Sequence, residues 1–296
     1  MAVESPAATQ GWRQCTARVA RHQDAGAGHR WLELSLPRDS AVPVPGQFVQ
    51  LLLKPPASAV FLPRPMSVAG ARRQRGAWVL QFLYAAVGTG TRALAALEDG
   101  AEVDVLSPLG RGFPLQAAGT PVLIAGGRGV APLLFAADAL ARAGRRCEFL
   151  FGARSRAQLV ALSEARARLR GMRGSLHLCT DDGTVGHRGT VVGLLERLAP
   201  RFEPPLVLHA CGPHAMLKAV ADWAMTRGAR AFLAMESVMA CGTGVCRGCP
   251  LPRSAAAKRR FHPDRTPSLM GNAEWAMCCT EGPVFEARDL DWETIE

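Results

Sequence analysis

The chain has 296 residues, 48% of them hydrophobic, and 35 Lys and Arg against 25 Asp and Glu give it a net charge of +10. Its length is enough for two or three packed domains. The positive charge alone would suit a nucleic-acid partner, but the arginines are spread along the chain and form no clustered stripe, so we expect no nucleic-acid binding. No run reaches the ~18 apolar residues of a membrane helix. Met1–Gln10 lacks the basic and apolar regions of a secretion signal. We therefore expect a cytoplasmic protein without a membrane span.

The cysteines favour a metal centre over a disulfide framework. There are nine. Five lie in the last quarter of the chain, and the other four are scattered. Free buried thiols together with one metal cluster fit a reducing compartment.

Residues 1–116 show short strands separated by Gly and Pro. Residues 48–53 form an apolar run that stops at Pro55-Pro56, and residues 78–84 and 102–106 form two more. Closely spaced strands with turn signals predict a small antiparallel β-barrel.

Strands alternate with helices in residues 117–230, which predicts a doubly wound parallel sheet. The predicted strands cover residues 122–125, 147–151, 175–179 and 206–210, and the helices cover 132–142, 158–170, 191–198 and 215–226. Residues 231–296 are rich in Gly and Cys and have little periodicity. A metal cluster would stabilise such a segment in place of a large apolar core.

The sharpest motif runs from Cys241 through Cys246 to Cys249. Its C-x4-C-x2-C spacing matches the loop of plant-type ferredoxins, which holds a 2Fe–2S cluster. The interleaved glycines let the backbone curl around the cluster and bring N–H groups to its sulfur atoms. Structural zinc is the alternative, because C-x2-C alone is common in zinc sites, but the x4 arm and the glycines argue against it. The residues themselves leave the fourth ligand open between Cys278 and Cys279.

A flavin site is suggested by Arg64-Pro65-Met66-Ser67, which follows a strand. A planar guanidinium and a hydroxyl suit the flavin phosphate and ring edge, although a surface turn explains four residues equally well. Tyr84 and the downstream Gly90-Thr91 strengthen the case, since an aromatic strand end and a glycine turn can hold the ring and the pyrophosphate.

A dinucleotide site is suggested by the turn from Gly126 to Pro132. Its backbone amides and the following helix could meet a pyrophosphate. The turn does not match G-x-G-x-x-G, and any tight strand-to-helix turn uses glycine. Cys211 ends what we take as the last strand of the sheet, at the carboxyl edge where ligands bind. The alternative for Cys211 is a small buried hydrophobic residue.

These segments occur in the order flavin barrel, nicotinamide domain, 2Fe–2S tail. Together with residues 107–113, 180–187 and 281–285, they make the chain resemble the electron transfer subunits of class 1B dihydroorotate dehydrogenases, in the ferredoxin reductase superfamily. The resemblance covers roughly residues 12–290.

The resemblance implies three cofactor sites. FAD would contact Arg64, Pro65, Met66, Ser67, Leu83, Tyr84, Ala85, Gly90 and Thr91. NAD(H) would lie over Gly126, Gly127, Gly129 and Pro132, with its nicotinamide near Cys211. The cluster would be held by Cys241, Cys246, Cys249 and Cys279, because the family's fourth ligand stands two residues before Glu281. FAD is needed because nicotinamide transfers two electrons together and the cluster takes one.

The resemblance also implies a partner. Electrons would pass to or from the FMN of a separate catalytic subunit, in a heterotetramer of two copies of each chain that serves pyrimidine biosynthesis. The chain itself would have no dihydroorotate site. Two alternatives stay open: the same cofactors serving a sulfide, sulfite or hydrogenase partner, and a non-catalytic adaptor stabilised by zinc.

Several positions depart from the family. Met66 replaces a frequent aromatic residue, and Arg128 replaces an apolar one and could reach a phosphate. The segment between Cys249 and Cys279 is longer than usual. It contains Lys258-Arg259-Arg260 and several prolines, among them Pro252, Pro263 and Pro267. We therefore expect an exposed basic loop that is either a solvated insertion or a contact for an acidic partner surface. Residues 154–156 follow the second strand of the nicotinamide domain, where a protein could bind the 2′-phosphate that distinguishes NADP from NAD. We expect NAD to be preferred over NADP.

Overall fold

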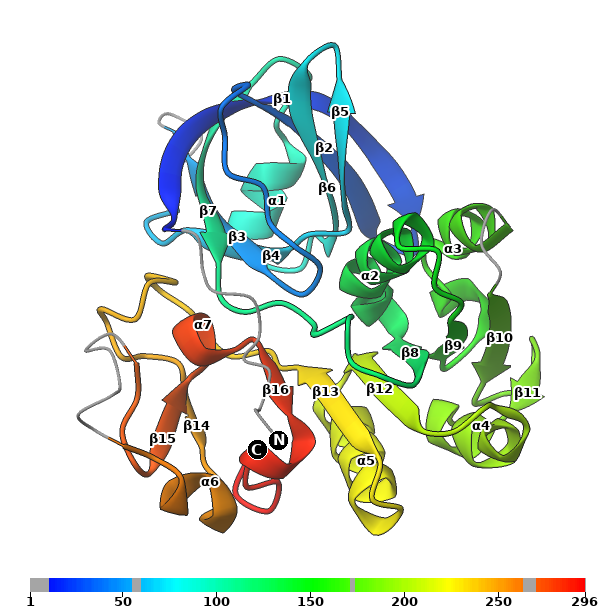
Figure 1. The fold of residues 1–296 in the computed structure, drawn as a ribbon. Coiled ribbons are helices and arrows are strands. Elements are labelled where there is room, and N and C mark those ends of the chain that lie inside the picture. The colour runs from blue at the N-terminus through cyan, green and yellow to red at the C-terminus, as the bar shows by residue number, and fades with distance from the viewer. Residues whose placement is uncertain (1–10, 55–59, 171–173, 263–269, 296) are drawn as a thin grey trace.

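The computed structural model describes residues 11–54, 60–170, 174–262 and 270–295. The predictions for Met1–Gln10, Pro55-Pro56, Pro263 and Pro267 lie outside these residues. Figure 1 shows three regions: a curled antiparallel sheet at the top, an α/β sheet at the lower right and the C-terminal segment at the lower left. Among the described helices, none is long and apolar enough to cross a membrane.

The first region is a seven-stranded antiparallel sheet. Its strands are β1 (Arg13–Gly26), β2 (His29–Leu36), β3 (Phe48–Leu53), β4 (Arg64–Ser67), β5 (Gly70–Gln74), β6 (Ala77–Ala85) and β7 (Glu102–Leu109), in the order β4-β3-β7-β1-β2-β6-β5. The antiparallel prediction is confirmed. Within the described residues no hydrogen-bonded ladder joins β4 to β5, so the sheet is curled and its predicted closure into a barrel is not seen.

Side chains on alternate sides of β3 enter two different cores. Val49 and Leu51 point into the curl of the sheet, where Leu94 of α1 (Thr89–Ala95) packs with them. Phe48 points outward and is buried by the C-terminal segment, and Gln50 on the same face is fully buried. Because a strand alternates its side chains, β3 is covered on both faces.

The second region is the predicted doubly wound sheet. Its strands are β8 (Thr120–Gly126), β9 (Glu148–Ala153), β10 (Ser175–Thr180), β11 (His187–Arg188), β12 (Leu206–Cys211), β13 (Arg230–Ala234) and β16 (Val284–Glu286), in the order β11-β10-β9-β8-β12-β13-β16. All neighbours are parallel except β13 and β16. The prediction that Cys211 ends the last strand is therefore wrong, since β13 and β16 extend the sheet beyond it.

Helices cover both faces of this sheet. They are α2 (Val130–Arg142), α3 (Leu162–Arg170), α4 (Val191–Leu198) and α5 (His214–Thr226). On β8, Leu123 and Ala125 pack with α2 and α3, while Val122 and Ile124 pack with α4 and α5. This apolar run buried on both faces is typical of a parallel strand between helical layers.

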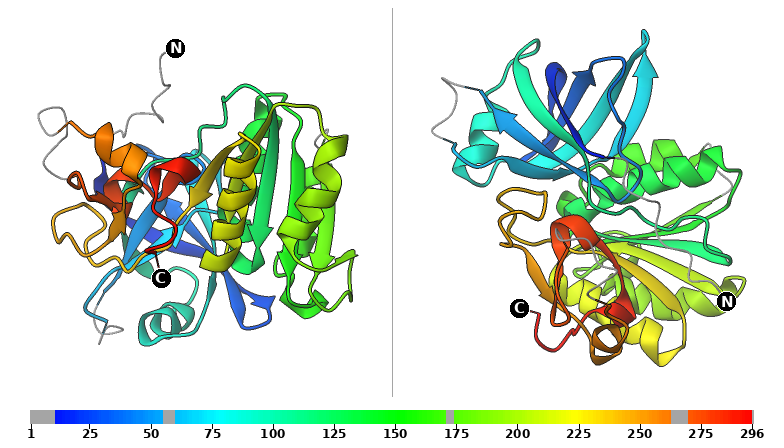
Figure 2. Two further views of the ribbon diagram at one scale, coloured as in Figure 1. Left: turned by 90° about the horizontal axis from the view of Figure 1, so that it is seen from below. Right: turned by 60° about the vertical axis from the view of Figure 1, so that its left-hand side comes forward.

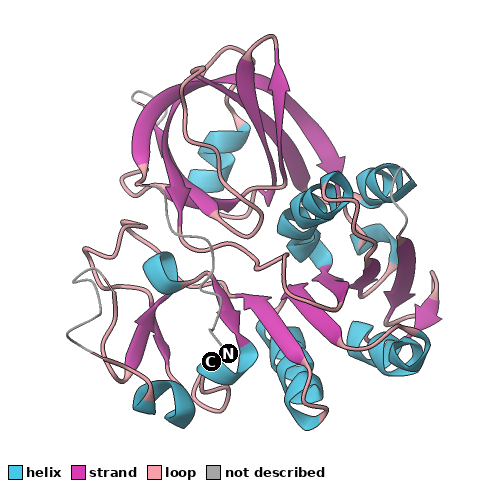
Figure 3. Cartoon of the chain, viewed as in Figure 1, coloured by secondary structure: helices cyan, strands magenta, loops and turns pink. Residues whose placement is uncertain are grey.

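The C-terminal segment is mostly loop (Figure 3) and lies beside both other regions in the two views of Figure 2. It contains β14 (Pro250–Pro252), α6 (Ala255–Arg259), β15 (Trp275–Met277) and α7 (Cys278–Glu281), and β14 pairs with β15. The described part of the insertion is thus more ordered than the exposed basic loop we predicted. Lys258 forms an ion pair with Glu274, and Arg260 forms one with Asp289, so two of its cations are paired within the chain.

One buried arginine joins the two sheets. Arg168 on α3 donates to Asp138 Oδ2 on α2 at 2.7 Å, and also to the carbonyl oxygen of Ala69 and to Gln81 Oε1, both at 2.8 Å. The Arg168 and Asp138 side chains are only 15% and 29% exposed. Burial raises the pKa of Asp138, and the neighbouring guanidinium opposes that rise.

We predict that Arg168→Leu lowers the free energy of unfolding by about 3 kcal/mol, because it leaves the Asp138 carboxylate without its cation. Urea denaturation followed by circular dichroism would measure the loss. Arg170→Leu on the same helix is the matched control, since Arg170 is exposed, and should change stability by less than about 0.5 kcal/mol. Equal losses in the two variants would contradict this role of Arg168.

Candidate functional site

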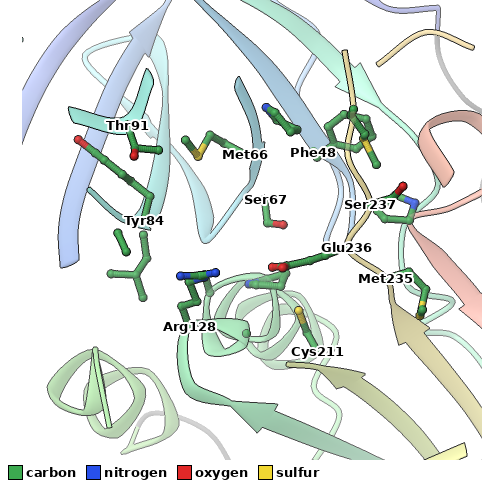
Figure 4. Close-up of a pocket in the computed structure, with 18 of the residues that line it drawn as sticks. Phe48, Met66, Ser67, Tyr84, Thr91, Arg128, Cys211, Met235, Glu236 and Ser237 are labelled. Atoms are coloured by element: carbon green, nitrogen blue, oxygen red, sulfur yellow. The ribbon is translucent and has the colours of Figure 1, made fainter. Parts of the chain in front are cut away.

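A cavity of about 280 Å³ opens between the curled sheet and the α/β sheet. The curled sheet contributes Pro65, Met66, Ser67, Leu83, Tyr84, Ala85 and Thr91, and the α/β region contributes Gly129, Pro132 and Cys211. In Figure 4 Thr91, Met66 and Ser67 lie in the upper part of the view, and Arg128 and Cys211 lie in the lower part. The structure therefore brings residues of the expected flavin and nicotinamide sites together around one space.

Arg64 and Gly90 are in direct contact although 26 positions separate them. A Cβ on Gly90 would lie 2.8 Å from Arg64 Cδ, so only glycine lets the arginine side chain pass. The guanidinium is held by the carbonyl oxygens of Pro63 at 3.0 Å and Leu62 at 3.1 Å. This arrangement places a fixed cation beside Gly90-Thr91, as a pyrophosphate site requires.

Tyr84, the single tyrosine of the chain, is buried at the end of β6. Its hydroxyl lies 2.8 Å from His22 Nε2. Burial raises the pKa of Tyr84, so the phenol stays neutral. A neutral ring fixed at its polar end is suited to packing against a flavin.

The glycine turn after β8 touches the end of β12. A Cβ on Gly126 would lie 2.6 Å from Met216 Sδ, and one on Gly129 would clash with the carbonyl group of Cys211. Gly127 has a φ of +51°, a conformation that favours glycine. β8 and β12 are adjacent parallel strands whose following helices, α2 and α5, lie on opposite faces. Their carboxyl ends therefore form the crevice where doubly wound sheets bind ligands.

A second cavity of about 550 Å³ lies at this crevice. Gly126 and Gly127 line it, together with Arg154 after β9 and Asp181 after β10. Arg128 lines both cavities. The second cavity thus has the position and the polar groups expected for a nicotinamide nucleotide.

Cys211 is a neutral thiol at the floor of the first cavity. Burial raises its pKa, and the carboxylate of Glu236 raises it further, while Arg128 opposes them. A thiol in this state is a polarisable, uncharged contact and not a nucleophile. It is suited to lining a site where a hydride is exchanged.

Sequence reasoning missed several lining residues. They are Phe48, Met235, Glu236, Ser237, Met239 and Pro283, and Figure 4 shows Glu236 directed into the cavity. Glu236 stands two residues after the end of β13, the strand that pairs with β16. Had residues 230–234 been predicted as a strand, the rule that sites lie at carboxyl ends of parallel strands would have pointed to Glu236.

Hydrogen bonds join four of the C-terminal cysteines in two pairs, Cys241 with Cys246 and Cys249 with Cys279. The N–H groups of Thr243 and Cys246 each lie 3.4 Å from Cys241 Sγ. The N–H of Cys279 lies 3.4 Å from Cys249 Sγ, and the two side chains are also hydrogen bonded. Cys278 Sγ instead lies 3.9 Å from the carbonyl oxygen of Met235.

The charge state of these thiols suits metal binding. Burial opposes ionisation of Cys241, but the N–H groups of Cys246 and Thr243 lower its pKa to about 6. The hydrogen bond from Cys279 lowers the pKa of Cys249 to about 7 and raises that of Cys279. Burial raises the pKa of Cys278.

No three His, Cys, Asp or Glu side chains in the described parts of the chain are already arranged as metal ligands. The donor set nevertheless fits an iron–sulfur cluster, since Cys241, Cys249 and Cys279 influence one another's ionisation and backbone N–H groups point at the sulfur atoms. Cys246 is exposed at the loop surface. Cys279 is hydrogen bonded to Cys249, whereas the Cys278 thiol donates to the carbonyl oxygen of Met235.

Comparison with solved structures gives the class of fold. The chain superposes on an NADH-dependent reduced ferredoxin-NADP oxidoreductase with a TM-score of 0.76 and 24% identity, over 94% of this chain and 90% of that one. It also matches the cytochrome b5 reductase domain of Ulva prolifera nitrate reductase with a TM-score of 0.57 and 19% identity, over 70% of this chain and 89% of that one. Residues 123–222 match the family model described as "Oxidoreductase NAD-binding domain". The fold is thus ferredoxin reductase-like, and residues 123–222 carry the NAD-binding domain of oxidoreductases.

Curated relatives narrow this class. The chain is 34% identical to the "Dihydroorotate dehydrogenase B (NAD(+)), electron transfer subunit" of Listeria monocytogenes serotype 4b, over 83% of this chain and 87% of the relative. It is 36% identical to the protein of the same name from Shouchella clausii, over 83% of this chain and 86% of the relative. The chain belongs to the family of dihydroorotate dehydrogenase B electron transfer subunits, and the resemblance read from the sequence is confirmed.

The adjacent cysteines give a direct test of the fourth ligand. We predict that Cys279→Ser removes the iron from the purified protein, while Cys278→Ser keeps it, because only the Cys279 side chain lies against Cys249. Iron and sulfide analysis with visible absorption would measure the content. Iron lost from Cys278→Ser and retained by Cys279→Ser would reverse the assignment.

Proposed function

We propose that this chain is the electron transfer subunit of a dihydroorotate dehydrogenase. It moves electrons between NAD(H), FAD and a 2Fe–2S cluster, to or from the FMN of a separate catalytic subunit in pyrimidine biosynthesis. FAD is assigned to residues 1–116, NAD(H) to 117–230 and the cluster to 231–296, with β13 and β16 of the last range completing the nicotinamide sheet.

The observation that carries this proposal is the sharing of Phe48 and Met239 between the first cavity and the cysteine segment. Both line the cavity. Both also belong to the buried apolar cluster that contains Cys249 and Cys279. The flavin cavity and the thiols therefore border the same buried apolar cluster, which suits electron transfer between them.

The residues of the chain divide the work. Arg64 and Gly90-Thr91 hold the flavin phosphates, and Tyr84 packs against the ring. Cys211 and Pro132 border the place where nicotinamide meets flavin. Bound FAD supplies the exchange between the two-electron chemistry of nicotinamide and the one-electron chemistry of the cluster.

The partner is inferred from the relatives, whose names specify a dihydroorotate dehydrogenase subunit that uses NAD(+). In the proposed complex, two copies of this chain assemble with two FMN-containing catalytic subunits, and dihydroorotate and orotate interconvert in the partner. Cys246 is the exposed thiol of the cluster loop, so the loop is accessible for electron exchange with that partner.

Reconstitution tests this function. We expect this chain, mixed anaerobically with the FMN-containing dihydroorotate-oxidising subunit, to support NAD⁺ reduction by dihydroorotate, measured at 340 nm, while either chain alone does not. The complex should elute as one species of four chains in light scattering. No activity with that subunit, together with NADH-driven reduction of a sulfide, sulfite or hydrogenase partner, would assign the chain to another acceptor.

The nucleotide preference can be tested on the second cavity. We predict that NADH reduces the bound flavin at least about tenfold more efficiently than NADPH, a difference of about 1.4 kcal/mol. The relatives are named for NAD(+), and the Asp181 carboxylate, which lines the cavity together with Arg128 and Arg154, opposes the binding of a 2′-phosphate. Stopped-flow reduction of the flavin with each nucleotide would measure this preference, and Asp181→Ser should narrow it. Equal efficiency of NADH and NADPH in the unmodified protein would contradict the NAD assignment.

A further inference from the structure

Gln50 occupies an unusual position for a polar side chain. It lies in the middle of β3, paired with Pro65 of β4 and Leu106 of β7, and it is 0% exposed. Its side chain points out of the curled sheet, on the same side as Phe48. An apolar side chain could be buried here without the free-energy cost of removing a polar group from water, so the carboxamide needs an explanation.

The carboxamide has no partner for either of its ends. Within the described residues, neither Gln50 Nε2 nor Gln50 Oε1 makes a hydrogen bond. A buried polar group left in this state costs about 1–3 kcal/mol. The other buried unpartnered atoms, His209 Nδ1 and His214 Nε2, belong to rings that are stacked on Phe232 and Trp292. Gln50 lacks such a packing role.

The group faces the cysteine loop. A Cβ on Gly242 would lie 2.8 Å from both Cγ and Nε2 of Gln50, so the carboxamide rests against the peptide that follows Cys241. Gly242 has a φ of +74°, which favours glycine here. Gln50 Nε2 thus lies beside Gly242, the residue after the first cysteine of the C-x4-C-x2-C motif, and it reaches that position from the sheet that lines the first cavity.

We propose that Gln50 is a positioning and tuning residue of the cluster, whose amide N–H donates a hydrogen bond to a sulfur atom on the Cys241 side. This inference rests on the 2Fe–2S centre of the proposed function. Reduction adds negative charge to the sulfur atoms, and a donor held in a buried site stabilises that charge. Gln50 therefore raises the reduction potential of the centre. It lies on β3, the strand that also carries Phe48 of the flavin cavity.

The proposal predicts the effect of removing the donor. In Gln50→Leu, which keeps the approximate size of the side chain, the ratio of reduced to oxidised cluster at a fixed potential should fall about tenfold, equivalent to about 59 mV for one electron. Gln50→Glu, which replaces the donor by an acceptor, should shift the ratio in the same direction. Redox titration of the holoprotein, followed by electron paramagnetic resonance, would measure both. The same signal from the wild type should contain a coupling to an exchangeable proton that is absent in Gln50→Leu.

Val49→Ala is the matched control. Val49 is equally buried but points into the curl of the sheet, so this change should lower thermal stability and leave the cluster ratio unchanged. An iron-containing Gln50→Leu protein with the wild-type ratio would overturn the role of Gln50 and leave the proposed function intact. A wild-type protein that binds FAD but no iron would overturn the cluster assignment and this inference with it.

Discussion

The double burial of β3 is the constraint on which the rest of the structure depends. One face of the strand, with Val49 and Leu51, forms the interior of the curled sheet, and the other face, with Phe48 and Gln50, is covered by the cysteine segment. A strand buried on both faces fixes the position of whatever lies on each side of it. Because Phe48 also lines the cavity between the sheets, the proposed flavin and cluster sites share one rigid wall.

Close backbone contacts supply the precision that side chains alone would not. Gly129 packs on the carbonyl group of Cys211, and Gly90 packs on the side chain of Arg64. Each contact joins segments that are distant in the chain and leaves no room for a Cβ. These two glycines therefore set how closely the segments on either side of the cavities approach one another.

Much of the architecture could be predicted from the sequence because its signals are local. The alternation of apolar runs and helices between residues 120 and 226 marks a parallel sheet. The spacing of Cys241, Cys246 and Cys249 is equally local, and it is the basis of the proposed cluster loop. The choice of Cys279 over Cys278 came from family resemblance, because adjacent residues carry no local signal of which side chain turns inward.

The features that escaped prediction depend on long-range pairing. β16 consists of three residues and becomes a strand only because β13 offers it an open edge. Glu236 enters the cavity as a consequence of the same pairing. Residues 255–259 form α6 where a loop was expected, and Lys258 pairs with Glu274, a partner that no composition rule could reveal. The importance of Gln50 likewise comes from what the C-terminal segment places against it.

Arg128 gives the two cavities a common wall, since its side chain borders both of them. An anionic ligand that binds the Arg128 guanidinium in one cavity changes the electrostatic field in the other. Thermodynamic linkage makes this influence mutual: whatever free energy a bound flavin adds to nucleotide binding, a bound nucleotide adds equally to flavin binding. Arg128 stands where the family usually has an apolar residue. Because of this charge, the affinity of each cavity for its ligand depends on whether the other cavity is occupied.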